Sequence, residues 1–360
     1  MAPLRRSKRL KAKATSTSEV DRFYTREKKP RDREPPSRLP SAADRDLDLQ
    51  LVMSGILSDD SKLQLDSTTQ LLNLVSVEDN PNPMIDQVVQ LGAVPRFVEF
   101  LKRDDYPQLQ FKAILVLKNI AAANTQVVIN SGAVPVFVKL LESSSHDLQT
   151  CEQVAWSLGN IAGESFSCCD VVLNCGALRP LLTLSEKHNN SLSFLRIATR
   201  TLTNIFETLT NISGGAPKVP LQQVLFAIRT FKSLLDLKDE EVLKEACWAL
   251  FYITHYKNGI ETTMYKDEDV AFKLADLFDH APLIVLFPAL RAMTSIVHGA
   301  YWNMDRRVLL LRGLCIGAMM RKDIHHFFKK DKRCHDQFEF EMQMLMPSFE
   351  KAVYMPHTEE

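Results

Sequence analysis

The sequence lacks any apolar segment long enough to cross a membrane. No stretch of about 18 uncharged apolar residues occurs among its 360 residues, and the two best candidates are interrupted by Pro288 and Arg312. No apolar run follows the basic residues of the N-terminus, so we expect no secretory signal peptide. The sequence therefore predicts a protein without a membrane partner.

The sequence also has little that would support chemistry. Its seven cysteines form no CxxC pair and no known zinc spacing, so we expect reduced thiols, no metal and a cytosolic or nuclear protein. Gly214-Gly215 and Lys218 do not form a phosphate-binding loop. No Ser/His/Asp or Cys/His set falls on one identifiable rigid element. We expect neither an enzyme nor a cofactor.

Net charge is absent as well, because two parts of the chain cancel. The sequence holds 44 Lys and Arg against 44 Asp and Glu, but residues 1–40 alone have a net charge of +8. The other 320 residues have a net charge of −8. A basic arm precedes an acidic body, and the body's field would attract basic ligands.

Apolar periodicity and leucine content divide the sequence into three parts. Residues 1–43 lack apolar periodicity and are predicted to be a largely disordered basic arm. Leu-rich segments fill residues 44–302. The segment 303–360 breaks the pattern, and we expect it to cap the preceding array, because a terminal repeat otherwise exposes its core.

Two recurring strings reveal internal repeats in the middle part. A Gly-Ala-Val-Pro-like string places glycines at 92, 132 and 176, in steps of 40 and 44 residues. A second string, Leu115-Val-Leu-Lys-Asn-Ile, recurs from positions 156, 200, 248 and 291 in steps of 41, 44, 48 and 43. Because two independent strings share one period, the repeat is real.

Within each period, residues that are typical of helix ends and helix starts recur. Gly132 suits the left-handed residue after a helix, and Pro135 suits the first turn of the next. A longer helix over 148–162 follows, and a divergent helical segment is expected over 59–75. Three helices per 40–48 residues without strand patterns predict an all-α, right-handed armadillo-repeat solenoid of about five repeats.

The third helix of the repeat carries the candidate site. Trp156 and Asn160 lie four residues apart, hence on one face, largely away from the apolar series of this helix. An indole accepts a Lys or Arg side chain, and an Asn amide can bind the backbone of an extended peptide. The structural alternative is that Trp156 belongs to the core and that the repeated asparagines tie loops together.

These strings resemble the importin alpha family over residues 44–300, most clearly in Trp156-Ser-Leu-Gly-Asn-Ile-Ala-Gly163 and Cys247-Trp-Ala-Leu. The resemblance implies an armadillo receptor that clamps lysine-rich nuclear localisation signals. It further implies that Glu164 pairs with the key lysine of the signal and that Thr125 assists from the preceding repeat. The peptide-binding residues implied in this way are Asn119, Thr125, Trp156, Asn160, Glu164, Asn204, Trp248 and Tyr252.

In the family, the tryptophan and the asparagine of the third helix recur at corresponding positions, or rungs, of a ladder along the array. This chain departs from that pattern at several rungs. Where the family has tryptophan, this chain has Leu115 and Arg200, and the arginine places a cation where a cationic ligand would lie. His255 replaces the expected acid, and Ser295 replaces the expected Asn. The resemblance therefore predicts a reduced version of the family's major signal site.

The basic arm resembles the family's importin-beta-binding segment in position and charge. Its two basic clusters comprise Arg5, Arg6, Lys8 and Arg9, and Lys28, Lys29 and Arg31. A solvated tail or salt-sensitive, sequence-blind contact with nucleic acid is the alternative. We expect no specific nucleic-acid partner.

Two hypotheses of function follow. The first is an adaptor that binds cargo with Lys/Arg-rich signals, engages importin beta and moves between cytoplasm and nucleus. The family's array has about twice as many repeats, so the second is a truncated armadillo scaffold or decoy that binds partner proteins without completing transport.

Overall fold

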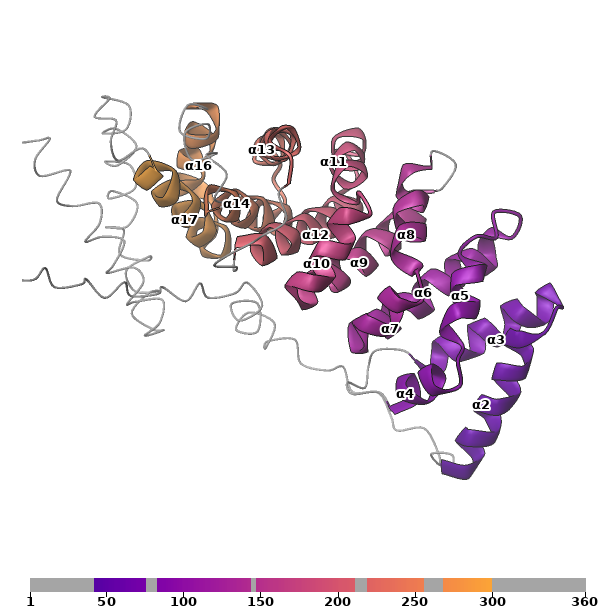
Figure 1. The fold of residues 1–360 in the computed structure, drawn as a ribbon. Helices are drawn as coiled ribbons and strands as arrows, with labels where there is room; N and C mark the ends of the chain where they lie inside the picture. The colour runs from indigo at the N-terminus through magenta and orange to yellow at the C-terminus, as the bar shows by residue number, and fades with distance from the viewer. Residues whose placement is uncertain (1–41, 76–82, 144–146, 211–218, 256–267, 300–360) are drawn as a thin grey trace, which may run out of the picture. The chain divides into compact units, whose positions relative to one another are not determined.

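The computed structural model describes residues 42–75, 83–143, 147–210, 219–255 and 268–299, and all regular structure in these ranges is helical (Figure 1). Two helices lead, α2 (Ala42–Leu57) and α3 (Ser61–Leu74). Three units of three helices follow: α4 (Pro83–Gln90), α5 (Val94–Phe100) and α6 (Pro107–Ala123); α7 (Thr125–Asn130), α8 (Ala133–Glu142) and α9 (Leu148–Glu164); α10 (Phe166–Asn174), α11 (Leu178–Lys187) and α12 (Leu192–Thr210). Two described pairs complete the order: α13 (Leu221–Leu234) with α14 (Glu240–His255), and α16 (Glu268–His280) with α17 (Leu283–Gly299). The predicted all-α class is confirmed.

Side-chain caps fix where several helices begin. The Asp60 carboxylate accepts hydrogen bonds from the backbone N–H groups of Lys62 and Leu63 at the start of α3. Asp147 accepts from the Thr150 N–H at 2.7 Å at the start of α9. The helix predicted over 148–162 extends two residues further, to Glu164, and the predicted leading segment 59–75 is α3.

Three glycines mark the same junction in successive units. Gly92, Gly132 and Gly176 have φ angles of 73°, 76° and 83°, a left-handed conformation that costs other residues about 1–2 kcal/mol. Each lies between the first and the second helix of its unit. The prediction for Gly132 is confirmed, and the spacing of the three glycines is a backbone requirement.

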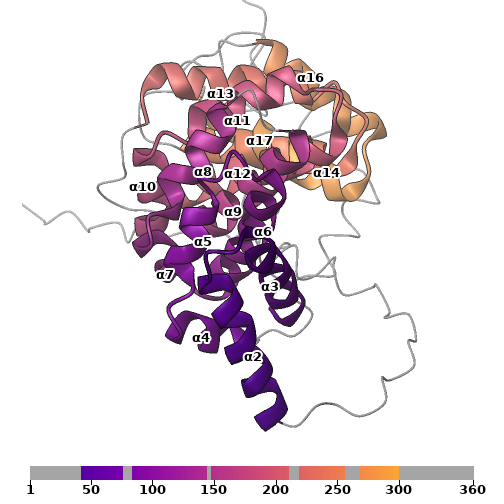
Figure 2. The same cartoon turned by 90° about the vertical axis from the view of Figure 1, so that its right-hand side faces the viewer.

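The long helices contact one another in chain order. Helix α3 packs on α6, α6 on α9, α9 on α12, α12 on α14 and α14 on α17. The second helices form a parallel series in which α8 contacts α11, α11 contacts α13 and α13 contacts α16. Figures 1 and 2 show both series. Each unit therefore buries its apolar face against the next, as a solenoid requires.

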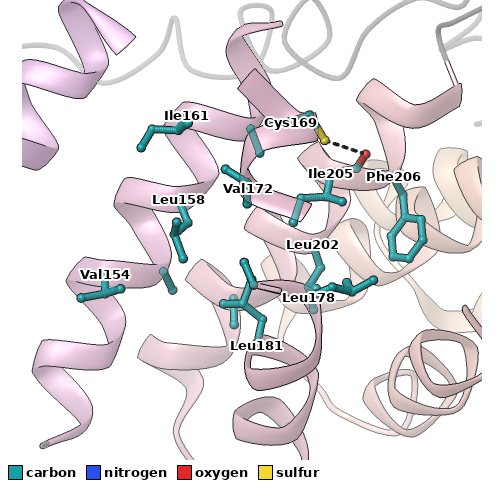
Figure 3. Packing of buried hydrophobic residues seen from close by; sticks show 14 of the residues in the cluster. Val154, Leu158, Ile161, Cys169, Val172, Leu178, Leu181, Leu202, Ile205 and Phe206 are labelled. Carbon is teal, nitrogen blue, oxygen red and sulfur yellow. Dashed lines mark hydrogen bonds between the residues drawn. The ribbon is translucent and has the colours of Figure 1, made fainter. Parts of the chain in front are cut away.

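A continuous apolar core runs between the units. On α9, Val154, Leu158 and Ile161 are fully buried, as their spacing predicts (Figure 3). They face a set of buried side chains from the third unit that includes Val172, Leu178 and Leu181. Full burial of one such side chain contributes about 1.5–3 kcal/mol.

The described cysteines belong to this core. Cys169 is buried, its thiol lies 3.8 Å from the Ile205 carbonyl oxygen, and burial raises the pKa of Cys169 to about 12. Burial also raises the pKa of Cys151, Cys175 and Cys247. All the described cysteines are unbridged, and none of these four thiols is activated as a nucleophile.

The described residues were compared with the requirements of a metal site and of a membrane-spanning helix. No group of three or more His, Cys, Asp or Glu side chains in these ranges is placed to hold a metal ion. No single described helix is long and apolar enough to span a membrane; α10 and α11 together meet a criterion of length and composition, but they are bent by 72°.

Candidate functional site

Trp156 lies on the surface of α9. Its side chain is 47% exposed, whereas Val154 and Leu158 on the same helix are fully buried. The helix therefore separates a core face from a second face that carries the indole. The alternative that Trp156 fills the core is wrong.

Asn160 and Glu164 continue the exposed stripe one and two turns beyond the indole, because residues four apart share a helix face. Asn160 is half-buried, and no hydrogen bond joins its amide to another described residue. Glu164 is exposed and is the last residue of α9. An aromatic face, an amide and a carboxylate thus lie in line. We call Trp156, Asn160 and Glu164 the α9 stripe.

A lysine of the preceding unit lies on the indole. Lys118 of α6 places Nζ 4.8 Å from the centroid of the Trp156 ring. The same ammonium donates a hydrogen bond of 2.8 Å to Oε1 of Gln153, one turn before Trp156. Desolvation by burial lowers the pKa of Lys118. The sequence interpretation missed this residue, although a charged side chain aligned with Gly159 in the recurring string is a signal that could have found it.

Two of the expected ladder asparagines tie neighbouring units together. The Asn119 amide is buried and donates to the Val75 carbonyl oxygen at 3.2 Å. The half-buried Asn204 amide donates to the Gly159 carbonyl oxygen at 3.3 Å. Both bonds connect a third helix to the unit before it. For these two residues the structural alternative has direct support, and their binding role stays a prediction.

Glycine at position 159 permits the close approach of α9 and α12. A Cβ there would lie 2.5 Å from Oγ1 of Thr201, which donates to the Ala155 carbonyl oxygen at 2.9 Å. Such a distance forces a neighbouring group to move. This contact holds the third-unit helix beside the α9 stripe.

Thr125 is placed differently from the α9 stripe. Its side chain is buried at the start of α7, and its hydroxyl donates to the Ala121 carbonyl oxygen at 2.8 Å. That bond leaves the hydroxyl oxygen as an acceptor only. The expected partnership with Glu164 stays a prediction.

The rung formed by Trp248 and Tyr252 is buried. The two side chains are 3% and 1% exposed, and their rings stack with centroids 5.8 Å apart. Phe251 and Phe287 contact the Trp248 ring edge-on at 5.6 Å. A ligand side chain reaches this indole only if the ring cluster opens, so the α9 stripe is the accessible part of the predicted ladder.

The positions that depart from the expected ladder have partners of their own. Arg200 is exposed, and its Nε lies 3.5 Å from Oε1 of Glu245, a carboxylate that is 3% exposed. The Ser295 and Thr254 hydroxyls lie 2.6 Å apart, and Nδ1 of His255 lies 2.9 Å from the Phe251 carbonyl oxygen. These rungs are therefore occupied by contacts within the array. The basic residues of the arm, from Arg5 to Arg31, lie outside the described residues.

Comparison with known folds identifies the class. The family model for the armadillo/beta-catenin-like repeat matches residues 81–122 and 122–163. A crystal structure of an engineered protein aligns at a TM-score of 0.58 with 25% identity, covering 70% of this chain and 97% of that one. A designed armadillo repeat protein, solved in complex with the peptide (KR)4, aligns at a TM-score of 0.57 with 24% identity, covering 69% of this chain and 99% of the other. The array is an armadillo-repeat fold.

Comparison with curated proteins narrows this class. Importin subunit alpha-1b of Oryza sativa subsp. japonica is 44% identical over 255 residues, which is 70% of this chain and 45% of the relative. Importin subunit alpha-2 of Arabidopsis thaliana is 46% identical over 236 residues, which is 64% of this chain and 42% of the relative. The chain is similar to the importin alpha subunits, and it spans about half the length of the curated relatives it matches. The family resemblance drawn from the sequence is confirmed.

Proposed function

We propose that this protein is a nuclear import adaptor whose α9 stripe binds an extended, basic localisation signal of a cargo protein. The relatives named importin alpha support the adaptor role in general. The observation that carries the proposal for this chain is the line of exposed Trp156, half-buried Asn160 and exposed Glu164 on the third helix of an armadillo unit.

Each member of the stripe supplies one kind of contact. The indole face of Trp156 takes the stem and ammonium of a lysine. The Asn160 amide donates to and accepts from the peptide backbone, which keeps the peptide extended. Glu164 is exposed at the helix end, where its carboxylate pairs with a second cationic side chain of the signal. The site therefore recognises a peptide rich in lysine and arginine, and no bond is made or broken.

The charge distribution supports the same ligand. Apart from the basic arm, the body carries a net charge of −8. A field of this sign raises the rate at which a basic peptide encounters the stripe, and salt screens it. Binding of a lysine-rich peptide should weaken as salt increases, whereas the loss caused by removing Trp156 should change little.

The test is a titration of a labelled lysine-rich peptide into the full chain, followed by fluorescence anisotropy at several salt concentrations. Trp156→Ala and Asn160→Ala should each weaken binding by about 1–2 kcal/mol. Phe272→Ala is the control for Trp156, because Phe272 is also aromatic and 47% exposed but lies on α16. Asn130→Ala on α7 is the control for Asn160. If the wild type does not saturate, or if both stripe variants bind like their controls, the proposal is wrong.

The second candidate is a truncated armadillo scaffold or decoy, and the seven basic residues of the arm separate it from the adaptor. As an adaptor, the full chain binds importin beta through this arm, carries cargo with a lysine- and arginine-rich signal, and moves between cytoplasm and nucleus. A pull-down of importin beta by the full chain should then be lost when these residues are changed to alanine: Arg5, Arg6, Lys8, Arg9, Lys28, Lys29 and Arg31. Cargo binding without any capture of importin beta would favour the decoy.

A further inference from the structure

The contact between Lys118 and Trp156 joins two units across the proposed site. Lys118 belongs to α6 and Trp156 to α9, yet Nζ lies 4.8 Å from the indole centroid and 2.8 Å from Oε1 of Gln153. The lysine side chain is half-buried, so its stem fills space beside the ring and its ammonium is partly withdrawn from water. An ammonium over an indole face is the arrangement that the proposed function assigns to a lysine of the ligand.

Among the described residues, this ammonium has an amide for a neighbour and no carboxylate. Within the described part of the chain, no acidic side chain lies within 4 Å of the Lys118 Nζ, and the hydrogen bond that it donates goes to Gln153, which is neutral. Desolvation alone is responsible for the lowered pKa of Lys118. Arg200 on α12 differs in this respect, because the Glu245 carboxylate compensates its charge. The attraction of the indole and of one amide therefore holds Lys118 in place.

We infer that Lys118 is a specificity-determining residue, which occupies the indole face of Trp156 and competes with a cationic side chain of the ligand for it. This inference rests on the proposed function. A lysine of a signal peptide reaches the ring only by displacing Lys118, and two cations cannot share one face without repulsion. The displaced ammonium loses both the ring and the Gln153 bond. A cationic side chain of the ligand therefore binds at Trp156 more weakly than it would without Lys118, which lowers the preference of this position for lysine over an uncharged side chain.

The size of the effect follows from the contact that the ligand has to replace. A cation over an indole at a partly desolvated site is worth enough to change a dissociation constant by about threefold to tenfold. Lys118→Met keeps the stem over the ring and removes the charge, so the packing of α6 on α9 is preserved. A lysine-rich peptide should bind this variant about threefold to tenfold more tightly than the wild type.

The experiment is a double-mutant cycle on the full chain with one labelled lysine-rich peptide. The variants are Lys118→Met, Trp156→Ala and the two combined, with Lys112→Met as the control for losing one positive charge from α6. Tighter binding for Lys118→Met, no change for Lys112→Met, and no gain in the Trp156→Ala background would support the inference.

The failures of the two proposals are distinguishable. If the wild type binds saturably and Lys118→Met binds equally or more weakly, the inference is overturned and the proposed function stands. If no variant binds saturably, both are overturned.

A second measurement needs no ligand. Ring-current shifts of the Lys118 side-chain methylene protons should be present in the wild type and lost in Trp156→Ala. Unshifted methylene protons in the wild type would overturn the inference directly.

Discussion

Trp156 and Trp248 occupy the same position in the recurring string, but their removal should have very different consequences for stability. Trp248 is 3% exposed and has three aromatic neighbours, whereas Trp156 is 47% exposed. A buried tryptophan removes about 150–250 Å² from water, and replacing one with alanine costs about 3–5 kcal/mol because a cavity remains. Trp156 leaves no enclosed cavity, so we expect its replacement to cost about 1 kcal/mol.

The assay is urea unfolding of the full chain followed by far-ultraviolet circular dichroism, with the free energy of unfolding compared between Trp248→Ala and Trp156→Ala. At an unfolding entropy of about 2.1 cal/mol/K per residue, each kcal/mol corresponds to about 1–2 °C in the melting temperature of a chain of 360 residues, which gives a second measure. Equal losses for the two variants would refute the reasoning, because the exposure of Trp156 and the burial of Trp248 are what separate them. A larger loss for Trp156→Ala would refute it more strongly.

Three further changes test the supports of the site. Gly132→Ala should lower the free energy of unfolding by about 1–2 kcal/mol, measured by urea titration, because a side chain there meets no clash and only the φ of 76° is strained. Asn119→Ala should cost about 1–3 kcal/mol, measured by thermal unfolding, since it leaves the Val75 carbonyl without this donor. Arg196 lowers the pKa of Asp239 through a hydrogen bond of 2.6 Å. The stabilisation from a carboxylate with a lowered pKa is present above its ordinary pKa of 3.8 and is lost as pH falls, so the difference in stability between wild type and Arg196→Ala should be larger at pH 7 than below pH 4, and an unchanged difference would contradict this.

The fold could be predicted from the sequence because its signals are local and repeated. Glycines recur at 92, 132 and 176 because the backbone at each position has a left-handed conformation that few other residues tolerate. The long helix of the second unit was predicted to within two residues of its observed end. A solenoid repeats one set of contacts, so the same local pattern specifies every unit.

The site could be predicted only in part, because exposure depends on neighbouring units. The spacing placed Trp156 and Asn160 on one helix face, and the family resemblance added Glu164. The structure places Trp156 and Glu164 on the surface. The spacing could not distinguish Trp156 from Trp248, whose burial includes contacts with Phe287 of the following unit. Contacts of this kind depend on how two distant segments pack, which a helical period does not specify.

Lys118 was missed for the same reason, because its contact depends on how two units pack. Its contact with Trp156 joins residues 38 positions apart, on helices of two units. In the sequence it is one of 44 Lys and Arg residues, and only its alignment with Gly159 sets it apart. The structure adds the distance to the indole and the absence of an acidic neighbour among the described residues, and both are needed before the residue has a function to test.

The central claim is that the α9 stripe binds basic peptides, and indole N–H signals in a nuclear magnetic resonance titration test it most directly. The chain has three tryptophans and therefore three indole signals, which Trp156→Phe and Trp248→Phe assign. Our account predicts that a lysine-rich peptide shifts the Trp156 signal saturably and leaves the Trp248 signal unchanged. A Trp156 signal that does not move, or a saturable shift confined to Trp248, would contradict it.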